Sequence, residues 1–122
     1  MRRSAAGLRF YRLIRTSPPT EDDFTPQGQQ PGYRVRPGLP PALRESIMHG
    51  VSVFDAIAVA RAQNDVFAER RFRSPFRYIA TLTITMDAAI ECDDSFGNQH
   101  HWDLYGTATE LLACVTPTDI EL

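Results

Sequence analysis

The stretch GVSVFDAIAVARAQ, residues 50–63, decides how this 122-residue chain folds. Side chains alternate along an extended backbone, so in a strand over residues 51–54 Ser52 and Phe54 share one face and the two valines share the other. Asp55 follows in the position of a helix N-cap, ahead of an alanine-rich run. The sequence therefore predicts a buried strand that turns directly into a helix, with the rest of the chain arranged around it.

The composition predicts a single domain, residues 1–122. A chain of this length buries about two thirds of the surface that its unfolded state exposes, so it needs no disulfide to fold. Cys92 and Cys114 each lie in an apolar or strand-like run without metal-ligand spacing, which favours reduced packing residues. No apolar run approaches the roughly 18 residues of a membrane span. We therefore expect a cytoplasmic protein with no membrane partner.

Charge is divided unevenly along the chain. Residues 1–77 carry all 13 arginines and seven acidic residues, whereas residues 78–122 carry eight acidic residues and neither arginine nor lysine. One interpretation is an anion-binding face built by the first part. The other is two complementary parts that fold on each other or pair between subunits of a homodimer.

The first strand is predicted over residues 8–15, where apolar residues alternate with arginine and tyrosine. This alternation puts Arg12 on the same face as Phe10 and Ile14. Charged side chains are seldom buried without a partner. Arg12 therefore lies at a strand end, in a cleft that receives an anion, or on a shallow edge strand.

Several further elements are predicted from the alternation of apolar residues and from the glycine and proline residues that end helices and strands. The chain has its clearest period-two pattern at residues 78–85. A short helix is expected to end at Gly50, and the helix after Asp55 is expected to run to about Arg71. The other predicted elements are the helix 43–49 and strands at 88–92 and 110–115, the last stopped by Pro117.

A proline-rich loop is predicted at residues 17–41, which hold seven of the nine prolines. Proline fixes φ and removes a hydrogen-bond donor, so neither a helix nor a central strand can run through this segment. Long loops of this kind are usually functional lids or disordered insertions. One helical turn over residues 20–24, capped by Thr20, is expected within it.

Two polar clusters suggest functions that we do not favour. Arg70–Arg77 interleaves arginine with Phe72 and Phe76, which is typical of a single-stranded nucleic-acid surface. The same pattern also fits a helix C-terminus above a solvated charge run, so nucleic acid is not the expected partner. His100–Asp103 contains metal-ligand residue types, but adjacent histidines on a strand point in opposite directions and do not easily share one ion. We therefore expect no metal.

Three segments, in this order, resemble the motifs of the ADP-ribosyltransferase-like superfamily. Phe10-Tyr11-Arg12 resembles the first-strand motif, whose His or Arg holds the nicotinamide and ribose of NAD. Residues 50–54, with the helix to Gln63, are similar to the second motif, which walls the nicotinamide pocket. Residues 110–115 are similar to the third motif, whose leading Glu bonds the ribose and supports the transition state. The likeness covers about thirty residues, and Arg12 fits the Arg-Ser-Glu subclass.

The resemblance implies a fold and a chemistry. The fold would be α+β: a single domain with a bent mixed or antiparallel sheet and two or three short helices. Glu110 would be the catalytic carboxylate that stabilises positive charge on the ribose. Arg12 would hold a phosphate or a ribose hydroxyl. Ser52 would orient the ribose or the nicotinamide amide, and Phe54 or Tyr11 would stack on the ring.

Two functions therefore follow from the sequence. The first is an NAD-binding domain of a bacterial toxin or effector, which transfers ADP-ribose or hydrolyses NAD. The second is a non-enzymatic module that binds a protein partner through the proline-rich loop and the charge-divided surface. For residues with simpler explanations the alternatives stay open: Glu110 could be a solvated strand start, and Ser52 a small residue in a tight core.

Overall fold

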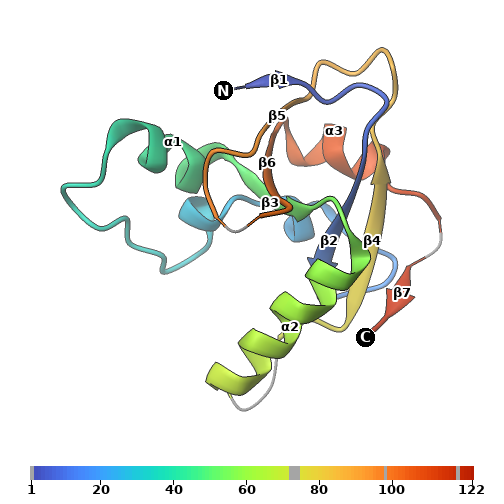
Figure 1. Cartoon of the computed structure of the whole chain (residues 1–122), viewed down its shortest axis with the longest axis horizontal. Coiled ribbons are helices and arrows are strands. Elements are labelled where there is room, and N and C mark those ends of the chain that lie inside the picture. Colours follow the sequence, from blue (N-terminus) through green and yellow to red (C-terminus); the bar gives the residue numbers. More distant parts are fainter. Residues whose placement is uncertain (1, 72–74, 98, 118) are drawn as a thin grey trace.

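A seven-stranded antiparallel sheet forms the centre of the molecule (Figure 1). The structure is a computed structural model that describes residues 2–71, 75–97, 99–117 and 119–122. The strands lie in the order β1-β5-β6-β3-β2-β4-β7, and every neighbouring pair is antiparallel. With three α-helices beside this sheet, the domain belongs to the α+β class, as predicted.

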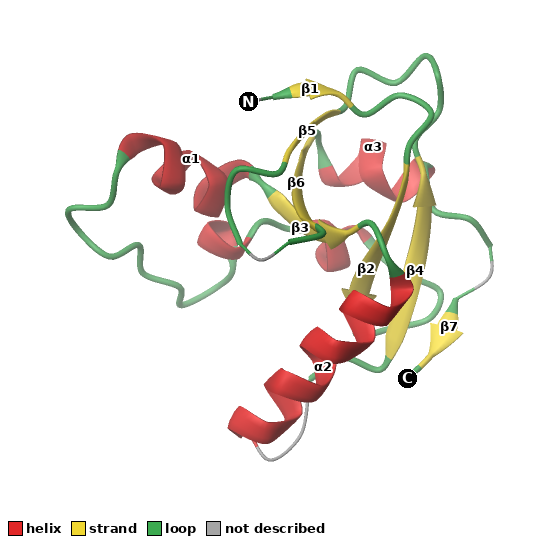
Figure 2. Ribbon diagram, viewed as in Figure 1, coloured by secondary structure: helices red, strands yellow, loops and turns green. Residues whose placement is uncertain are grey.

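The domain contains both helices and strands (Figure 2). The strands are β1 (Arg3–Ser4), β2 (Arg9–Ile14), β3 (Val51–Phe54), β4 (Tyr78–Thr83), β5 (Glu91–Asp93), β6 (His101–Tyr105) and β7 (Ile120–Glu121). The α-helices are α1 (Pro41–His49), α2 (Ile57–Arg71) and α3 (Ala108–Ala113), and two 3-10 turns, η1 (Glu21–Phe24) and η2 (Gln27–Gln29), precede them.

Each face of the sheet packs its own apolar cluster, because both faces are covered. On one face, α3 and η1 contribute Leu111 and Phe24 to a cluster that includes Phe10 and Val53. On the other face, Ala60 of α2 packs with residues of β2, β3 and β4. The second cluster consists of Leu13, Phe54, Ala60 and Ile79, with partly buried apolar residues around them. Burial on both faces makes β2, β3 and β4 the structural centre.

The stretch at residues 50–63 folds as predicted, as a strand that turns into a helix. The predicted strands at 8–15 and 78–85 correspond to β2 and β4, and the helix at 43–49 corresponds to α1. Because β2 lies between β3 and β4, the edge-strand interpretation of Arg12 is wrong. Both cysteines are buried and free, as expected.

The segment at residues 110–115 is helical, so its prediction as a strand is wrong. Thr107 is the N-cap of α3, and its side chain accepts a hydrogen bond from the backbone N–H of Glu110. The Glu110 carboxylate accepts one in return from the Thr107 backbone N–H at 2.9 Å. This reciprocal pair is a capping box, which satisfies two donors that a helix start would leave unpaired.

Asp55 does not act as the simple helix cap that the sequence predicts. Its carboxylate lies 2.7 Å from Nδ1 of His100 and accepts a hydrogen bond from the indole of Trp102 at 2.9 Å. These contacts tie the start of α2 to the chain around the start of β6. The strand β6 itself was not predicted, and the strand expected at 88–92 lies at Glu91–Asp93.

The first part of the proline-rich loop packs against the sheet, whereas the part that leads to α1 extends away from it (Figure 1). Its helical turn is η1, as expected, and the Asp23 carboxylate accepts hydrogen bonds from the backbone N–H groups of Thr20 and Arg15 and from the Thr16 hydroxyl. Buried Phe24 anchors the turn against the sheet. Among the helices of the described segments, none is long and apolar enough to cross a membrane.

Candidate functional site

The sheet is split between β2 and β3. The register joins these two strands at one residue pair, Tyr11 and Phe54, whereas β2 pairs with β4 along its whole length. Beyond that pair, the side chain of Arg12 spans the gap. Its Nη1 donates to the backbone oxygen of Ser52 at 2.6 Å, and its Nε donates to the backbone oxygen of Asp23 at 2.7 Å.

The Arg12 guanidinium is held tightly but stays charged. Burial lowers its pKa to about 10, against the opposing attraction of Asp23. Two of its five N–H groups donate to the carbonyls of Ser52 and Asp23. The remaining N–H groups are available to a ligand or to water, since no other hydrogen bond of Arg12 is found within the described ranges. Arg12 therefore combines a structural role with unused capacity for an anion.

A large cavity of about 1080 Å³ opens where the strands diverge, and we call it the split-sheet cavity. Arg12, Ser52 and Phe54 from β2 and β3, and His101 and Asp103 from β6, are among the residues that line it. The proline-rich loop supplies another part of the wall, including residues of η1 and η2. This loop is therefore part of the cavity lining.

Polar side chains of β3 and β6 gather on one face beside this cavity. Ser52 is directly opposite Asp103 in the register, so the two side chains share a face, and His101 lies two residues along. The Ser52 hydroxyl is 2.6 Å from Nε2 of His101, which lies 4.0 Å from Oδ1 of Asp103. From α1, the Ser46 hydroxyl donates to Oδ2 of Asp103 at 2.6 Å.

The tautomer of His101 follows from the contact that its ring nitrogen Nδ1 makes. Nδ1 lies 2.7 Å from the backbone oxygen of Phe96, which can only accept a hydrogen bond. In the neutral ring Nδ1 therefore carries the proton, and Nε2 accepts from the Ser52 hydroxyl. The ring also packs edge-on against Phe54, with centroids 5.7 Å apart.

Asp103 is the buried carboxylate of this group, with 4% of its surface exposed. Burial raises its pKa, because a charged carboxylate loses its hydration. The hydrogen bond from Ser46 and the nearby His101 act in the opposite direction and are outweighed.

The structure separates the residues that the sequence proposed for one site. Arg12, Ser52 and Phe54 line the split-sheet cavity. Tyr11 packs beside the apolar cluster under α2. Glu110 is exposed at the start of α3, where hydrogen bonds from Thr107 lower the pKa of its carboxyl. Its hydrogen bonds are those of a helix cap.

Sequence reasoning missed the contribution of β6. Residues 101–105 alternate polar and apolar side chains, His101 and Asp103 on one side and Trp102 and Leu104 on the other. This period-two pattern was the available signal for a strand. What brings His101 to Ser52 is the pairing of β6 with β3, which is set by residues distant in sequence.

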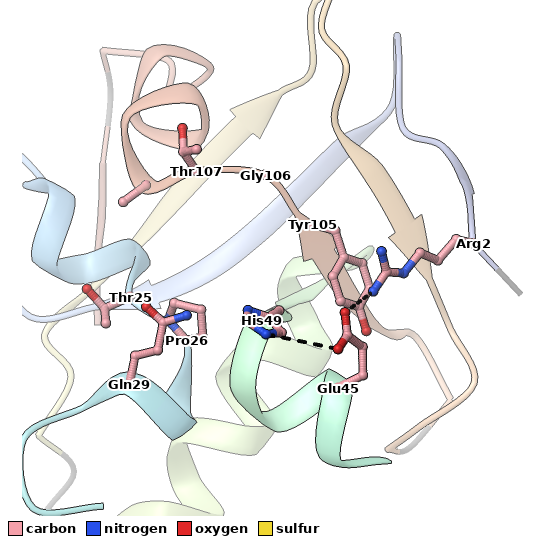
Figure 3. A pocket seen from close by; sticks show the side chains of 10 residues that line it. Arg2, Thr25, Pro26, Gln29, Glu45, His49, Tyr105, Gly106 and Thr107 are labelled. Atoms are coloured by element: carbon pink, nitrogen blue, oxygen red, sulfur yellow. Dashed lines mark hydrogen bonds and ion pairs between the residues drawn. The ribbon is translucent and has the colours of Figure 1, made fainter. Parts of the chain in front are cut away.

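A smaller cavity of about 450 Å³ lies between α1, β6 and the start of α3 (Figure 3). The guanidinium of Arg2 lies 3.6 Å from the centroid of the Tyr105 ring and pairs with Glu45 at 2.8 Å. His49 is 4.0 Å from the other oxygen of Glu45. The charges around this cavity are therefore paired with one another, whereas Arg12 keeps unused donors in the larger one.

Two other predictions concern metal binding and the arginine-rich run, and the structure describes only part of the residues that they involve. No cluster of three or more metal-ligand side chains occurs in the part of the chain that the structure describes. Of the arginine-rich run, residues 72–74 and the Arg71 side chain lie outside the described residues, and Arg70 and Arg77 are exposed. Comparison of the chain with protein-family models, with curated proteins and with solved structures finds no match.

Proposed function

We propose that the split-sheet cavity binds NAD and that the protein cleaves the bond between nicotinamide and ribose, transferring ADP-ribose or hydrolysing NAD. The observation that carries this proposal is the meeting of Arg12, Ser52 and Asp103 at one cavity, from three adjacent strands. The resemblance of the sequence to ADP-ribosyltransferase-like proteins supplied a guanidinium and a serine for such a site. The resemblance implied Glu110 as the carboxylate, whereas the carboxylate beside Ser52 at this cavity is Asp103.

Asp103 is the carboxylate that we assign to the transition state in place of Glu110. Cleavage of a bond to ribose passes through an oxocarbenium-like state, which a nearby carboxylate stabilises as positive charge develops. Asp103 lines the cavity beside Ser52, whereas the Glu110 carboxylate is occupied by its bond to Thr107. Burial strengthens this electrostatic effect, since a carboxylate with little water around it gains more from a cation.

Two arginines in the cavity lining suit the phosphates of NAD. Arg12 has N–H groups left over and lies with Arg15 on the cavity lining. Guanidinium groups bind phosphate oxygens with paired donors, which fixes orientation as well as charge. Asp23, the acidic residue whose charge acts on Arg12, already accepts hydrogen bonds from Thr16 and Thr20, so it is engaged within its own loop.

Size and aromatic lining also support a dinucleotide. Pockets for small organic ligands commonly measure about 300–1,000 Å³, and the split-sheet cavity slightly exceeds this range. Phe54 offers a ring beside Ser52, where the nicotinamide would lie. The proline-rich loop forms part of the wall, which favours a small-molecule ligand over the alternative of a loop that recruits a protein partner.

The decisive experiment compares two carboxylate variants. Purified protein is incubated with NAD, and free nicotinamide is measured by chromatography. We expect Asp103→Asn to abolish nicotinamide release and the matched variant Glu110→Gln to retain it, because glutamine preserves the capping box. Absence of turnover together with absence of a thermal shift in excess NAD would overturn the proposal, and so would loss of activity in Glu110→Gln alone.

A further inference from the structure

The contact between Ser52 and His101 has the geometry of a nucleophile and its base. The Ser52 hydroxyl donates to Nε2 of His101 at 2.6 Å, and Nδ1 donates to the backbone oxygen of Phe96 at 2.7 Å. Activated serines are recognised by this arrangement, in which a third group orients the base. Here the third group is a backbone carbonyl, which fixes the tautomer without adding charge.

The surroundings of the His101 ring hold it in this orientation. Gly97 has φ of +86°, and a Cβ atom at that position would lie 2.6 Å from Nδ1 of His101. Only glycine therefore allows the chain to pass so close to the ring. On another side the edge-on contact with Phe54 restricts the imidazole.

Access differs between the two partners in the way that catalysis requires. Ser52 is exposed and lines the split-sheet cavity, so a substrate in the cavity can reach its hydroxyl. His101 keeps only 16% of its side-chain surface exposed. A covered base with an open nucleophile favours reaction at serine over reaction at histidine.

We propose that Ser52 is an activated nucleophile that accepts the acyl group of small uncharged esters, with His101 as general base. The Ser52 oxygen bonds to the ester carbonyl carbon while Nε2 of His101 takes the hydroxyl proton. The bond to the leaving alcohol then breaks, and the alcohol receives that proton. Water, deprotonated by His101, hydrolyses the acyl-serine and restores Ser52.

Charge and lining define the substrate class. Arg12 donates to the Ser52 carbonyl and borders the same cavity, so its positive charge favours the oxyanion of the tetrahedral intermediate. Leu13, Ile47 and Phe54 supply apolar lining for the acyl chain. Asp103 lies 4.0 Å from the base and disfavours a substrate with a carboxylate at the reacting end.

This activity shares the split-sheet cavity with the proposed NAD reaction but does not depend on it. The test uses the intact protein, a fluorophosphonate probe with detection by intact mass and peptide mapping, and p-nitrophenyl butyrate as an ester. We expect one label per chain, on Ser52, and loss of that label in Ser52→Ala. His101→Gln should slow labelling by about 100-fold, which is what removal of a general base costs.

Controls separate chemistry from misfolding. Ser4→Ala changes an exposed serine on β1 and should label like the original protein. Circular dichroism and thermal unfolding establish that Ser52→Ala and His101→Gln are folded. No label on the original protein, a label on another residue, or equal labelling of Ser52→Ala would overturn this inference. Labelling of Ser52 without NAD turnover would support it and count against the NAD proposal, and NAD turnover without labelling would do the reverse.

Discussion

The Nη1 atom of Arg12 lies 2.6 Å from the backbone oxygen of Ser52, where a side chain takes the place of the hydrogen bonds that a continuous ladder would supply. The same guanidinium also donates to Asp23 in the proline-rich loop. One residue thus connects two strands and the loop that walls the cavity. This connection makes Arg12 important for stability as well as for a ligand.

We expect Arg12→Met to lower the free energy of unfolding by about 2 kcal/mol, because two carbonyl acceptors lose a charged donor. Chemical denaturation monitored by circular dichroism measures the change. Arg9→Met, at an exposed position of the same strand, is the matched control and should change stability by less than about 0.5 kcal/mol. Equal effects of the two variants would contradict the bridging role of Arg12.

Removal of the α3 cap should weaken the fold at a residue that does not line the split-sheet cavity. Thr107→Ala eliminates the side chain that accepts from the Glu110 N–H, and loss of such a cap costs about 1 kcal/mol. Unfolding in urea measures this loss. NAD turnover per folded molecule should stay unchanged, and a large fall in turnover would return Glu110 and its surroundings to the candidate site.

Asp103 should make stability depend on pH in a defined direction. Its pKa is raised by burial, so the folded state favours the protonated carboxyl relative to the unfolded state. The stabilisation that comes from protonation is complete below the ordinary value of 3.8 and is lost as the pH rises through the raised pKa. The original protein should therefore gain stability relative to Asp103→Asn as the pH falls through this range.

Denaturation of both proteins across this pH range measures the difference. The amide oxygen introduced by Asp103→Asn can still accept a hydrogen bond from Ser46, so the comparison isolates the charge. A stability difference that is constant with pH would contradict the assignment.

Gly97→Ala should disturb the Ser52–His101 contact selectively. Alanine at this position combines an unfavourable positive φ with a collision against the imidazole. Gly32→Ala is a matched control, because Gly32 also has positive φ, of +79°, but a Cβ atom there meets no neighbour within 4 Å. We expect both variants to lose stability and only Gly97→Ala to lose fluorophosphonate labelling at Ser52. Equal labelling of the two would show that the position of the ring does not matter.

Local patterns predict the central elements of this fold. The alternation in residues 8–15 and 78–85 and the strand-to-helix turn at 50–63 all appear in the structure. The run at 110–115 was mistaken for a strand because a short apolar run fits either a strand or a helix. The decisive signal was Thr107 three residues before Glu110, which is the sequence pattern of a capping box.

The candidate site could be predicted only in part. Arg12 was identified as a charged residue on an apolar face of a strand and through the family resemblance, and Ser52 through that resemblance alone. His101 and Asp103 were considered only as metal ligands, since their place beside Ser52 depends on the register between β3 and β6. That register is fixed by contacts between segments about fifty residues apart, and no local pattern records it.

Because β2 and β3 share one pair in the register, Tyr11 and Phe54, the sheet consists of two parts, which we call its wings. One wing holds β1, β5, β6 and β3, and the other holds β2, β4 and β7. A molecule bound in the split-sheet cavity contacts both wings and so adds contacts between them. Any ligand that fits should therefore raise the unfolding temperature as its concentration exceeds its Kd, so thermal scanning of compound collections can find it without knowledge of the reaction.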